Sequence, residues 1–198
     1  MPYLTIKDKG TRKLLNIDDE YIGFVYQSDI NEYDLNDGTD IDITKVEDLH
    51  SLIFKRTYKK ALSYLERSEY CASEIRFKLK MNDYSSVAIE RVIESLYKSK
   101  FLDDRRYAEA FIRSYSSTKG RKLMETELLH KNISSDVIND AFDAFYEDED
   151  YDEDEVIRSI LDKKYKGADL SDIKTKTKVL SYFMRKGFSV DKVNNHLT

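Results

Sequence analysis

The chain has 198 residues and a net charge of −5, with 40% hydrophobic and 36% charged residues. One proline and six glycines are few, and this scarcity of helix breakers favours a mainly helical fold. Cys71 is the only cysteine, which excludes an internal disulfide, and since neither an apolar leader nor the ~20 apolar residues of a membrane span is present, we expect a soluble cytoplasmic protein.

Residues 1–56 form a first predicted region that differs from the rest of the chain. Tyr3–Ile6 and Tyr21–Tyr26 alternate in the manner of strands, and Leu14–Ile17 could be a third strand. Lys9-Gly10 would turn the first hairpin. We therefore expect a small, β-rich antiparallel sheet at the N-terminus.

The end of this region predicts a loop followed by a helix. Residues 35–39 contain turn formers, and the helix is expected from about Lys45. Asp42 or Thr44 can accept a hydrogen bond from a backbone amide at the start of that helix.

A weak internal repeat organises the chain after residue 57. Ile75–Leu79 recurs as Met124–Leu128 49 residues later, and as Val179–Phe183 a further 55 residues on. A fixed period of apolar positions indicates one helical unit used repeatedly, because a single unit cannot bury its own apolar face. Such an array has a long surface with few pockets, which favours binding of an extended partner over chemistry in a cleft.

The predicted array consists of three repeats of three helices each, with an acidic insertion before the last. The ranges are 57–101 for repeat one, 102–146 for repeat two, 147–155 for the acidic insertion and 156–198 for repeat three. The second helix of repeat one is expected at about Ala72–Met81. Candidate helix caps are Asp103, Ser85 or Ser86, and Ser134 or Ser135.

Charge is unevenly distributed along the chain. Residues 1–56 have a net charge of −5, the acidic run Glu147–Glu155 has −8, and the remainder of residues 57–198 has +8. A basic array can attract a polyanion, although the same charges could simply solvate helix faces. The acidic run has two interpretations: a phosphate mimic competing for a basic site, on a partner or within this chain, or a disordered, solvating linker.

Basic residues that recur at similar places in the repeats are the candidate contacts with a filament or with DNA. The strongest group is Lys119, Arg121 and Lys122, around Gly120 at a helix start, where free backbone amides also attract anions. A stripe of such residues would meet phosphates without reading bases, and ordinary solvated surface is the alternative for each of them. The full set is Arg76, Lys80, Lys119, Arg121, Lys122, Lys163, Lys164, Lys174, Lys178, Arg185 and Lys186.

Five tyrosines could stack on bases. Their helical spacing and apolar neighbours favour core packing instead. These residues are Tyr58, Tyr64, Tyr107, Tyr115 and Tyr182.

The sequence offers no catalytic site. The three histidines are scattered without metal-ligand spacing, and Cys71 is interpreted as a structural residue. Asp103-Asp104 fits a helix start better than a metal-binding pair, and the glycines form no phosphate-cradling motif. We therefore expect a protein that is not an enzyme and has no catalytic residues, no metal and no cofactor.

Several of these residues together resemble the signature of the RecX family. The most specific part is Leu102-Asp103-Asp104-x-x-Tyr107-Ala108, followed by the glycine, methionine and Glu-Leu pair of Gly120–Leu128. Arg67, Glu74, Leu79 and Lys186-Gly187-Phe188 add to it. The resemblance covers about 58–198, and the N-terminal region looks like the short β-rich extension of some members.

The chain departs from the family pattern at a few positions. Cys71 stands where many members have serine, and Ser68 and Tyr70 stand where members have basic residues. Asn132 replaces a glycine of repeat two, but asparagine tolerates the left-handed conformation that ends a helix. The long acidic insertion is also unusual.

The resemblance implies a fold and a function. The fold is three tandem three-helix repeats in a curved array, and the function is binding in the groove of the RecA–DNA filament. A RecX-like chain would inhibit or modulate RecA in recombination, DNA repair and the SOS response. It would be a monomer, would bind DNA weakly and without sequence specificity, and would not contact membranes. The alternatives are a RecA-independent DNA-binding helical-repeat protein and, third, an enzyme.

Overall fold

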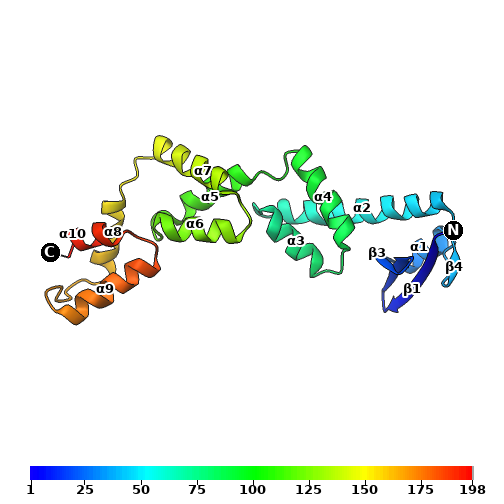
Figure 1. Ribbon diagram of the computed structural model, residues 1–198, viewed down its shortest axis with the longest axis horizontal. Coiled ribbons are helices and arrows are strands. Elements are labelled where there is room, and N and C mark those ends of the chain that lie inside the picture. The colour runs from blue at the N-terminus through cyan, green and yellow to red at the C-terminus, as the bar shows by residue number, and fades with distance from the viewer. Residues whose placement is uncertain (198) are drawn as a thin grey trace. The chain divides into compact units, whose positions relative to one another are not determined.

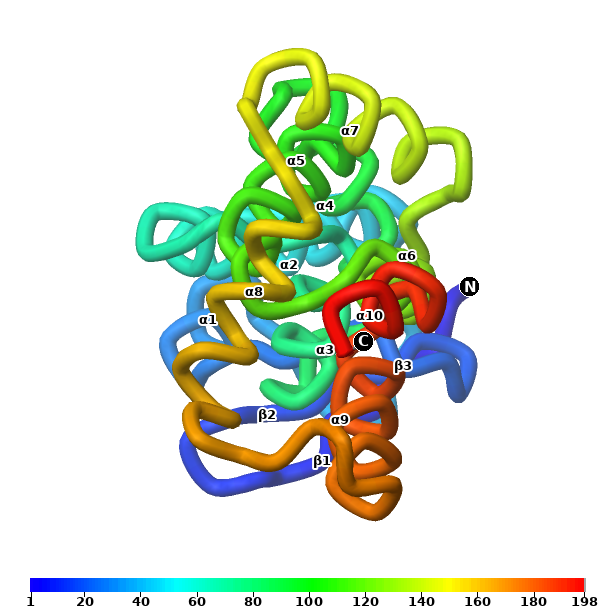
Figure 2. The backbone as a smooth tube through the Cα atoms, turned by 90° about the vertical axis from the view of Figure 1, so that its left-hand side faces the viewer, coloured from blue at the N-terminus to red at the C-terminus, as the bar shows by residue number. Residues whose placement is uncertain are grey.

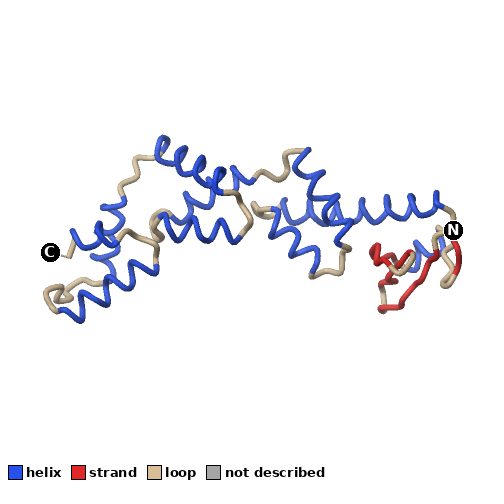
Figure 3. The backbone as a smooth tube through the Cα atoms, viewed as in Figure 1, coloured by secondary structure: helices blue, strands red, loops and turns tan. Residues whose placement is uncertain are grey.

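The computed structural model describes residues 1–197, which contain four strands and ten helices (Figure 1). All four strands lie before Asp42, and helices and loops make up the described residues after it (Figure 3). The predicted mainly helical fold with a β-rich N-terminal extension is confirmed. The chain forms two compact units, residues 1–103 and the residues from Asp104 onward. None of the described helices is both long and apolar enough to span a bilayer.

The N-terminal sheet is antiparallel, with the strand order β3-β2-β1-β4. The strands are β1 (Tyr3–Lys9), β2 (Arg12–Ile17), β3 (Glu20–Val25) and β4 (Thr39–Asp40). The three predicted strands are present. Strand β4, which begins at the last residue of the predicted loop, was missed because it has only two residues, which pair with Tyr3 and Leu4.

A short helix, α1 (Gln27–Glu32), was also missed. It begins after Tyr26, which is not a residue type that marks helix starts. The backbone N–H of Tyr26 instead donates to the Asp29 carboxylate at 2.6 Å, and this carboxylate also contacts Arg56 of the next helix. The start of α1 therefore depends on a contact that sequence spacing does not reveal.

Helix α2 (Ile43–Leu65) belongs to the sheet region and to repeat one at the same time. As predicted, Asp42 caps it, because its carboxylate accepts from the Thr44 backbone N–H at 2.8 Å. The predicted boundary at residues 56 and 57 falls inside this continuous helix. The sheet packs closely on α2, since a Cβ added to Gly23 of β3 would lie 2.8 Å from a side-chain carbon of Ile53.

Asp83, in the turn after the second helix of repeat one, fastens the sheet to that repeat. Lys9 and Arg12 pair with its carboxylate at 3.0 and 3.1 Å, and the Tyr21 hydroxyl donates to its backbone oxygen. The hydrogen bond from Lys9 lowers the pKa of Asp83 most, and the charges of Lys9 and Arg12 lower it further. The sheet is thus an integral part of the first compact unit.

The other helices follow in three sets. Repeat one continues with α3 (Ala72–Lys80) and α4 (Ser86–Lys98). The second set is α5 (Asp104–Tyr115), α6 (Arg121–His130) and α7 (Ser135–Asp148). The third set, which can be followed from yellow to red in Figure 2, is α8 (Glu153–Lys164), α9 (Ile173–Arg185) and α10 (Val190–Asn195).

The internal repeat of the sequence is also a repeat of backbone conformation. The turn before the last helix of each set contains a left-handed residue: Asp83 (φ 64°), Asn132 (φ 61°) and Gly187 (φ 83°). Two residues later a serine precedes the next helix: Ser85, Ser134 and Ser189. The hydroxyls of Ser85 and Ser134 accept from backbone amides of the helices that they start, as predicted. Asn132 keeps the left-handed turn in place of glycine, also as predicted.

Candidate nucleic-acid interface

The candidate basic residues lie on helices of both compact units. Arg76 and Lys80 lie on α3 in the first unit. In the second unit, the candidates lie at the start of α6 (Lys119, Arg121, Lys122), at the end of α8 (Lys163, Lys164) and on or just after α9 (Lys174, Lys178, Arg185, Lys186). The surroundings of each side chain decide whether its charge is available to a phosphate.

Lys119 is directed into the protein. Its ammonium pairs with Glu127 and lies 3.8 Å from the centroid of the Tyr115 ring, and only 17% of its side chain is exposed. A cation over an aromatic face is stabilising by about 0.5–2 kcal/mol. Lys119 therefore holds the loop before α6 in place, and its ammonium is poorly accessible to a ligand.

Arg121 joins α6 to α7. It pairs with Glu125 one turn along α6, and donates to the Asn139 side chain at 3.1 Å. Its guanidinium lies 4.6 Å from the centroid of the Phe142 ring. Burial lowers the pKa of Arg121, but the hydrogen bond and charge of Glu125 more than offset this effect, so that the group stays charged. Arg121, like Lys119, has a structural role.

Lys122 is the exposed member of the group at α6, and α9 adds further charge beside it. The Gly120 backbone N–H donates to the Lys186 carbonyl at 2.8 Å, which brings the end of α9 to the start of α6. We call Lys122, Arg185 and Lys186 the basic junction. Lys122 and Arg185 are exposed, Lys186 is half-buried, and none of the three forms an ion pair within residues 1–197.

The start of α6 is not the open anion site that we predicted. The backbone at Gly187 covers it so closely that a Cβ added there would lie 2.3 Å from the Leu123 nitrogen. A Cβ added to Gly120 would lie 2.4 Å from the Gly187 oxygen. The backbone at Gly187 therefore occupies the space beside the start of α6, and the exposed charges nearest to it are those of the basic junction.

The two candidates of the first unit differ from each other. Arg76 forms a two-pronged ion pair with Glu90 of α4, at distances of 2.9 to 3.1 Å. Lys80, at the end of α3, is exposed and has no ion pair among the described residues. Lys80 is therefore the better placed of the two to meet a ligand.

The remaining candidates belong to the third set of helices. The Lys164 ammonium lies 3.7 Å from the centroid of the Tyr182 ring of α9. Lys163, Lys174 and Lys178 are exposed and have no ion pair in the part of the chain that the structure describes. These three lysines and the basic junction place accessible positive charge on the third set and at the start of α6.

The tyrosines mostly pack inside the protein. Tyr107 is 8% exposed, and Tyr58, Tyr64 and Tyr182 are half-buried. Tyr115 is 39% exposed, but its ring lies under the Lys119 ammonium. The core-packing interpretation thus fits four of the five, and Tyr115 is the exposed exception.

The acidic run is built into two helices and is paired with basic residues. Its first two residues end α7, and Glu153–Glu155 start α8. Arg113 of α5 contacts Asp148 at 3.4 Å and Glu149 at 3.3 Å. In the second half, ion pairs join Asp152 to Arg158 and Glu153 to Lys192, and a hydrogen bond joins Asp154 to His196. The run therefore contacts basic side chains of other turns and helices in addition to solvent.

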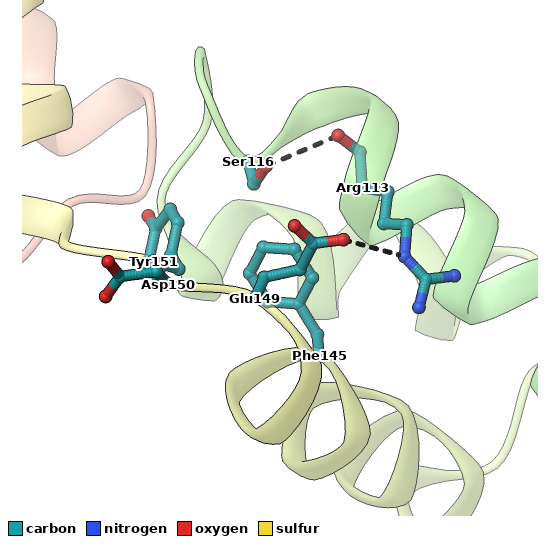
Figure 4. A pocket seen from close by; sticks show the side chains of 6 residues that line it. All are labelled: Arg113, Ser116, Phe145, Glu149, Asp150 and Tyr151. Carbon is teal, nitrogen blue, oxygen red and sulfur yellow. Dashed lines mark hydrogen bonds and ion pairs between the residues drawn. The ribbon is translucent and has the colours of Figure 1, made fainter.

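A small hollow of 180 Å³ lies beside the first half of the acidic run (Figure 4). The Arg113 guanidinium and the Glu149 carboxylate face each other there, and the rings of Phe145 and Tyr151 lie 5.2 Å apart. Burial and the nearby Glu153 raise the pKa of Tyr151. The lining residues are Arg113, Ser116, Phe145, Glu149, Asp150 and Tyr151.

Arg113 and Lys192 are charged residues that the sequence analysis did not select. Their acidic partners lie 35 to 39 residues away along the chain, and contacts at such a separation cannot be predicted from local sequence spacing. The one available signal was the acidic run itself, whose eight carboxylates require basic partners or solvent.

The residues considered for catalysis or metal binding lie in structural positions. Cys71 is 1% exposed and precedes α3, with its sulfur 3.2 Å from the Ser73 hydroxyl. Asp104 is the first residue of α5, and His196 contacts Asp154 at 2.7 Å. Among residues 1–197, no three His, Cys, Asp or Glu side chains come together in a way that could hold a metal ion.

Comparison with known families gives three matches along the chain. Residues 58–96 match the family model of the first three-helix domain of RecX, residues 103–141 match the second, and residues 152–197 match the third. The matches follow the three sets of helices in order.

Curated relatives and solved structures agree with these matches. The chain is 28% identical to the regulatory protein RecX of Clostridium acetobutylicum, over 96% of this chain and 91% of the relative. It is 27% identical to that of Bacillus subtilis, over 98% and 75%. The crystal structure of RecX from Lactobacillus salivarius matches 73% of this chain and 94% of its own at 25% identity, with a TM-score of 0.59. A crystal structure of regulatory protein RecX has the same fold, with a TM-score of 0.64 at 22% identity, over 98% of this chain and all of its own.

Proposed function

Because the chain belongs to the RecX family of regulatory proteins, we propose that it is a non-enzymatic regulator of the RecA recombinase. It binds the RecA–DNA filament in the cytoplasm as a monomer. By doing so it inhibits or modulates recombinase activity in recombination, DNA repair and the SOS response. The observation that carries this proposal is the ordered match of all three RecX domains to residues 58–197.

The accessible charge of the helical sets supports a contact with the DNA of the filament. Lysines that have no acidic partner among the described residues can each neutralise one phosphate, and each such contact releases counterions. Contacts of this kind position a protein on DNA but carry no sequence information. The DNA contribution is therefore weak, salt-dependent and not sequence-specific. The side chains that we propose for it are Lys80, Lys122, Lys163, Lys174, Lys178, Arg185 and Lys186.

The test is the ATPase activity of RecA on single-stranded DNA, measured with this protein well below the RecA concentration. We expect the activity to fall, since a protein that caps or disrupts a filament affects many RecA subunits at once. The triple variant K122A/R185A/K186A, which removes the basic junction, should require several times more protein for the same inhibition.

A matched control keeps the change of net charge but leaves the basic junction intact. Lys55, Lys59 and Lys98 are exposed and have no acidic partner within residues 1–197, so the variant K55A/K59A/K98A should inhibit RecA like the wild type. Unchanged ATPase activity at equimolar protein, together with tight binding to bare DNA, would contradict the proposal. That result would favour the RecA-independent DNA-binding protein instead.

A further inference from the structure

The first half of the acidic run occupies a basic residue in the way a bound polyanion would. Two carboxylates, from Asp148 and Glu149, contact two nitrogens of the single Arg113 guanidinium. Figure 4 shows the Glu149 carboxylate directed at Arg113 across the hollow. A guanidinium contacted by several anionic oxygens is also the arrangement by which arginine binds a phosphate.

The position of these acids at the end of α7 is electrostatically unfavourable. Residues 147–150 are all acidic and lie at the C-terminal end of the helix, where the helix dipole disfavours negative charge. The last turn of α7 contains no basic residue. In the described part of the chain, Arg113 is the basic residue paired with this segment, and the pairing neutralises charge on both sides.

A side chain from the start of α6 reaches the residues of α7 that come just before the acids. The Arg121 guanidinium lies over the rings of Phe142 and Tyr146 of α7, and the acidic run begins at the next residue, Glu147. A polyanion that approaches Arg113 or the start of α6 therefore meets the negative field of the run.

The second half of the run keeps the first half in place. Glu153 pairs with Lys192 at 2.8 Å, and Asp154 contacts His196 at 2.7 Å, so the start of α8 is held by α10. The segment between α7 and α8 is thus tethered at both ends, and its carboxylates remain at high effective concentration near Arg113.

We propose that residues 147–150 are an intramolecular phosphate mimic, whose carboxylates occupy Arg113 and lower the affinity of the second unit for DNA until DNA phosphates displace them. The inference rests on the proposed function, because it regulates the DNA contact of that function. It also makes Arg113 a phosphate contact whose guanidinium is paired with carboxylates in the free protein. The two ion pairs are exposed and 3.3 to 3.4 Å long, so a competing polyanion can break them.

The first experiment compares two charge-matched variants by fluorescence anisotropy with an oligo(dT) single strand, at low and physiological salt. D148N/E149Q removes the two carboxylates that pair with Arg113. D140N/D143N makes the same change of charge at two exposed residues of α7 that have no ion pair in the described chain. We expect D148N/E149Q to bind about two- to fivefold more tightly than D140N/D143N, the range that corresponds to exposed ion pairs.

The second experiment repeats the comparison with R113Q. In the wild-type background R113Q should change the affinity little, because Arg113 is already occupied. In the D148N/E149Q background it should remove the gain. Thermal unfolding of every variant checks that each remains folded.

Two outcomes would overturn the inference: equal gains for the two acidic variants, or a D148N/E149Q gain that persists with R113Q. If either of these outcomes occurs while the wild-type protein still inhibits the RecA ATPase, only the phosphate-mimic inference is wrong and the proposed function stands. If no variant binds DNA and the RecA ATPase is unchanged, both fail.

Discussion

Gly187 is the single residue on which the contact between the second and third sets of helices depends most. It combines a left-handed φ of 83° with a backbone that lies against Leu123 of α6. The first property disfavours any side chain with a Cβ, and the second leaves no room for one. Either condition alone is common for a glycine, but here both hold.

Gly187→Ala should therefore destabilise the protein by about 3 kcal/mol or more, because the strained φ and the clash add to each other. Gly167→Ala is the matched control, since Gly167 also has a positive φ (77°) but open space around it, and should cost only about 1 kcal/mol. Urea unfolding midpoints measure both values. Equal losses for the two variants would mean that the close contact adds nothing.

Arg56 and Asp29 form a largely buried ion pair in the first unit, with side chains 21% and 10% exposed. Arg56→Met should cost about 2 kcal/mol, because the largely buried Asp29 carboxylate loses one partner and keeps only the Tyr26 backbone N–H. Lys55→Met, one position earlier on the exposed face of α2, should cost less than about 0.5 kcal/mol. Urea unfolding of both variants checks the difference, and a comparable loss for Lys55→Met would argue against the ion pair.

At the level of single residues, the sequence predicted helix caps but not the surroundings of charged side chains. The caps Asp42, Ser85 and Ser134 were predicted because a cap bonds to amides two or three residues away, within reach of local pattern. The environments of Lys119 and Arg121 were not predicted, since they depend on aromatic rings and carboxylates of other turns and helices. The sequence showed which residues are positively charged, but not which of them are already in contact with carboxylates or aromatic rings.

Among the elements, α8 and α10 are joined by the second half of the acidic run. The hydrogen bond with His196 lowers the pKa of Asp154 below 3.8, and the charges of Lys192 and His196 act in the same direction. A carboxyl with a lowered pKa in the folded state stabilises the protein above its unfolded pKa. This stabilisation is lost as the pH falls through the folded value.

Asp154→Asn should therefore lower the unfolding midpoint near neutral pH, and the difference from the wild type should shrink as the pH falls below about 4. Asp150→Asn is the control, because Asp150 is exposed and has no ion pair among the described residues. Urea unfolding at neutral pH and at about pH 3 gives both comparisons. A difference that stays constant with pH would exclude the ionised form of Asp154 as its cause.

For the N-terminal sheet as well, the sequence predicted the local structure but not the long-range contacts. Its strands were predicted from alternation and its first turn from Lys9-Gly10, which are local signals. Its attachment to Asp83 joins residues more than 60 positions apart, so the sequence alone described an extension rather than part of repeat one. Helix α2 was divided at residue 56 for the same reason, since a change in composition does not interrupt a helix.

For the whole molecule, the division after Asp103 predicts that the first unit folds without the second. Residues 1–103 contain two hydrophobic cores of their own, one under the sheet around Leu15 and Leu49 and one around Ile75 and Ile93. A fragment of these residues should unfold cooperatively in urea and keep a helical circular dichroism spectrum. A gradual transition without a folded-state baseline would show that the first unit does not fold without the rest of the chain.

The junction of Gly120 with Gly187 has a consequence for how the chain can change in length. The acidic run lies between these two glycines, whose contact fixes the start of α6 against the end of α9 whatever the length of the segment joining α7 to α8. Doubling the length of such a connection costs only about 0.6 kcal/mol of closure entropy. The longer spacing of 55 residues, against 49 in the first period, is therefore inexpensive here. The connection between α7 and α8 is the natural place for insertions in this chain, whether added by evolution or by design.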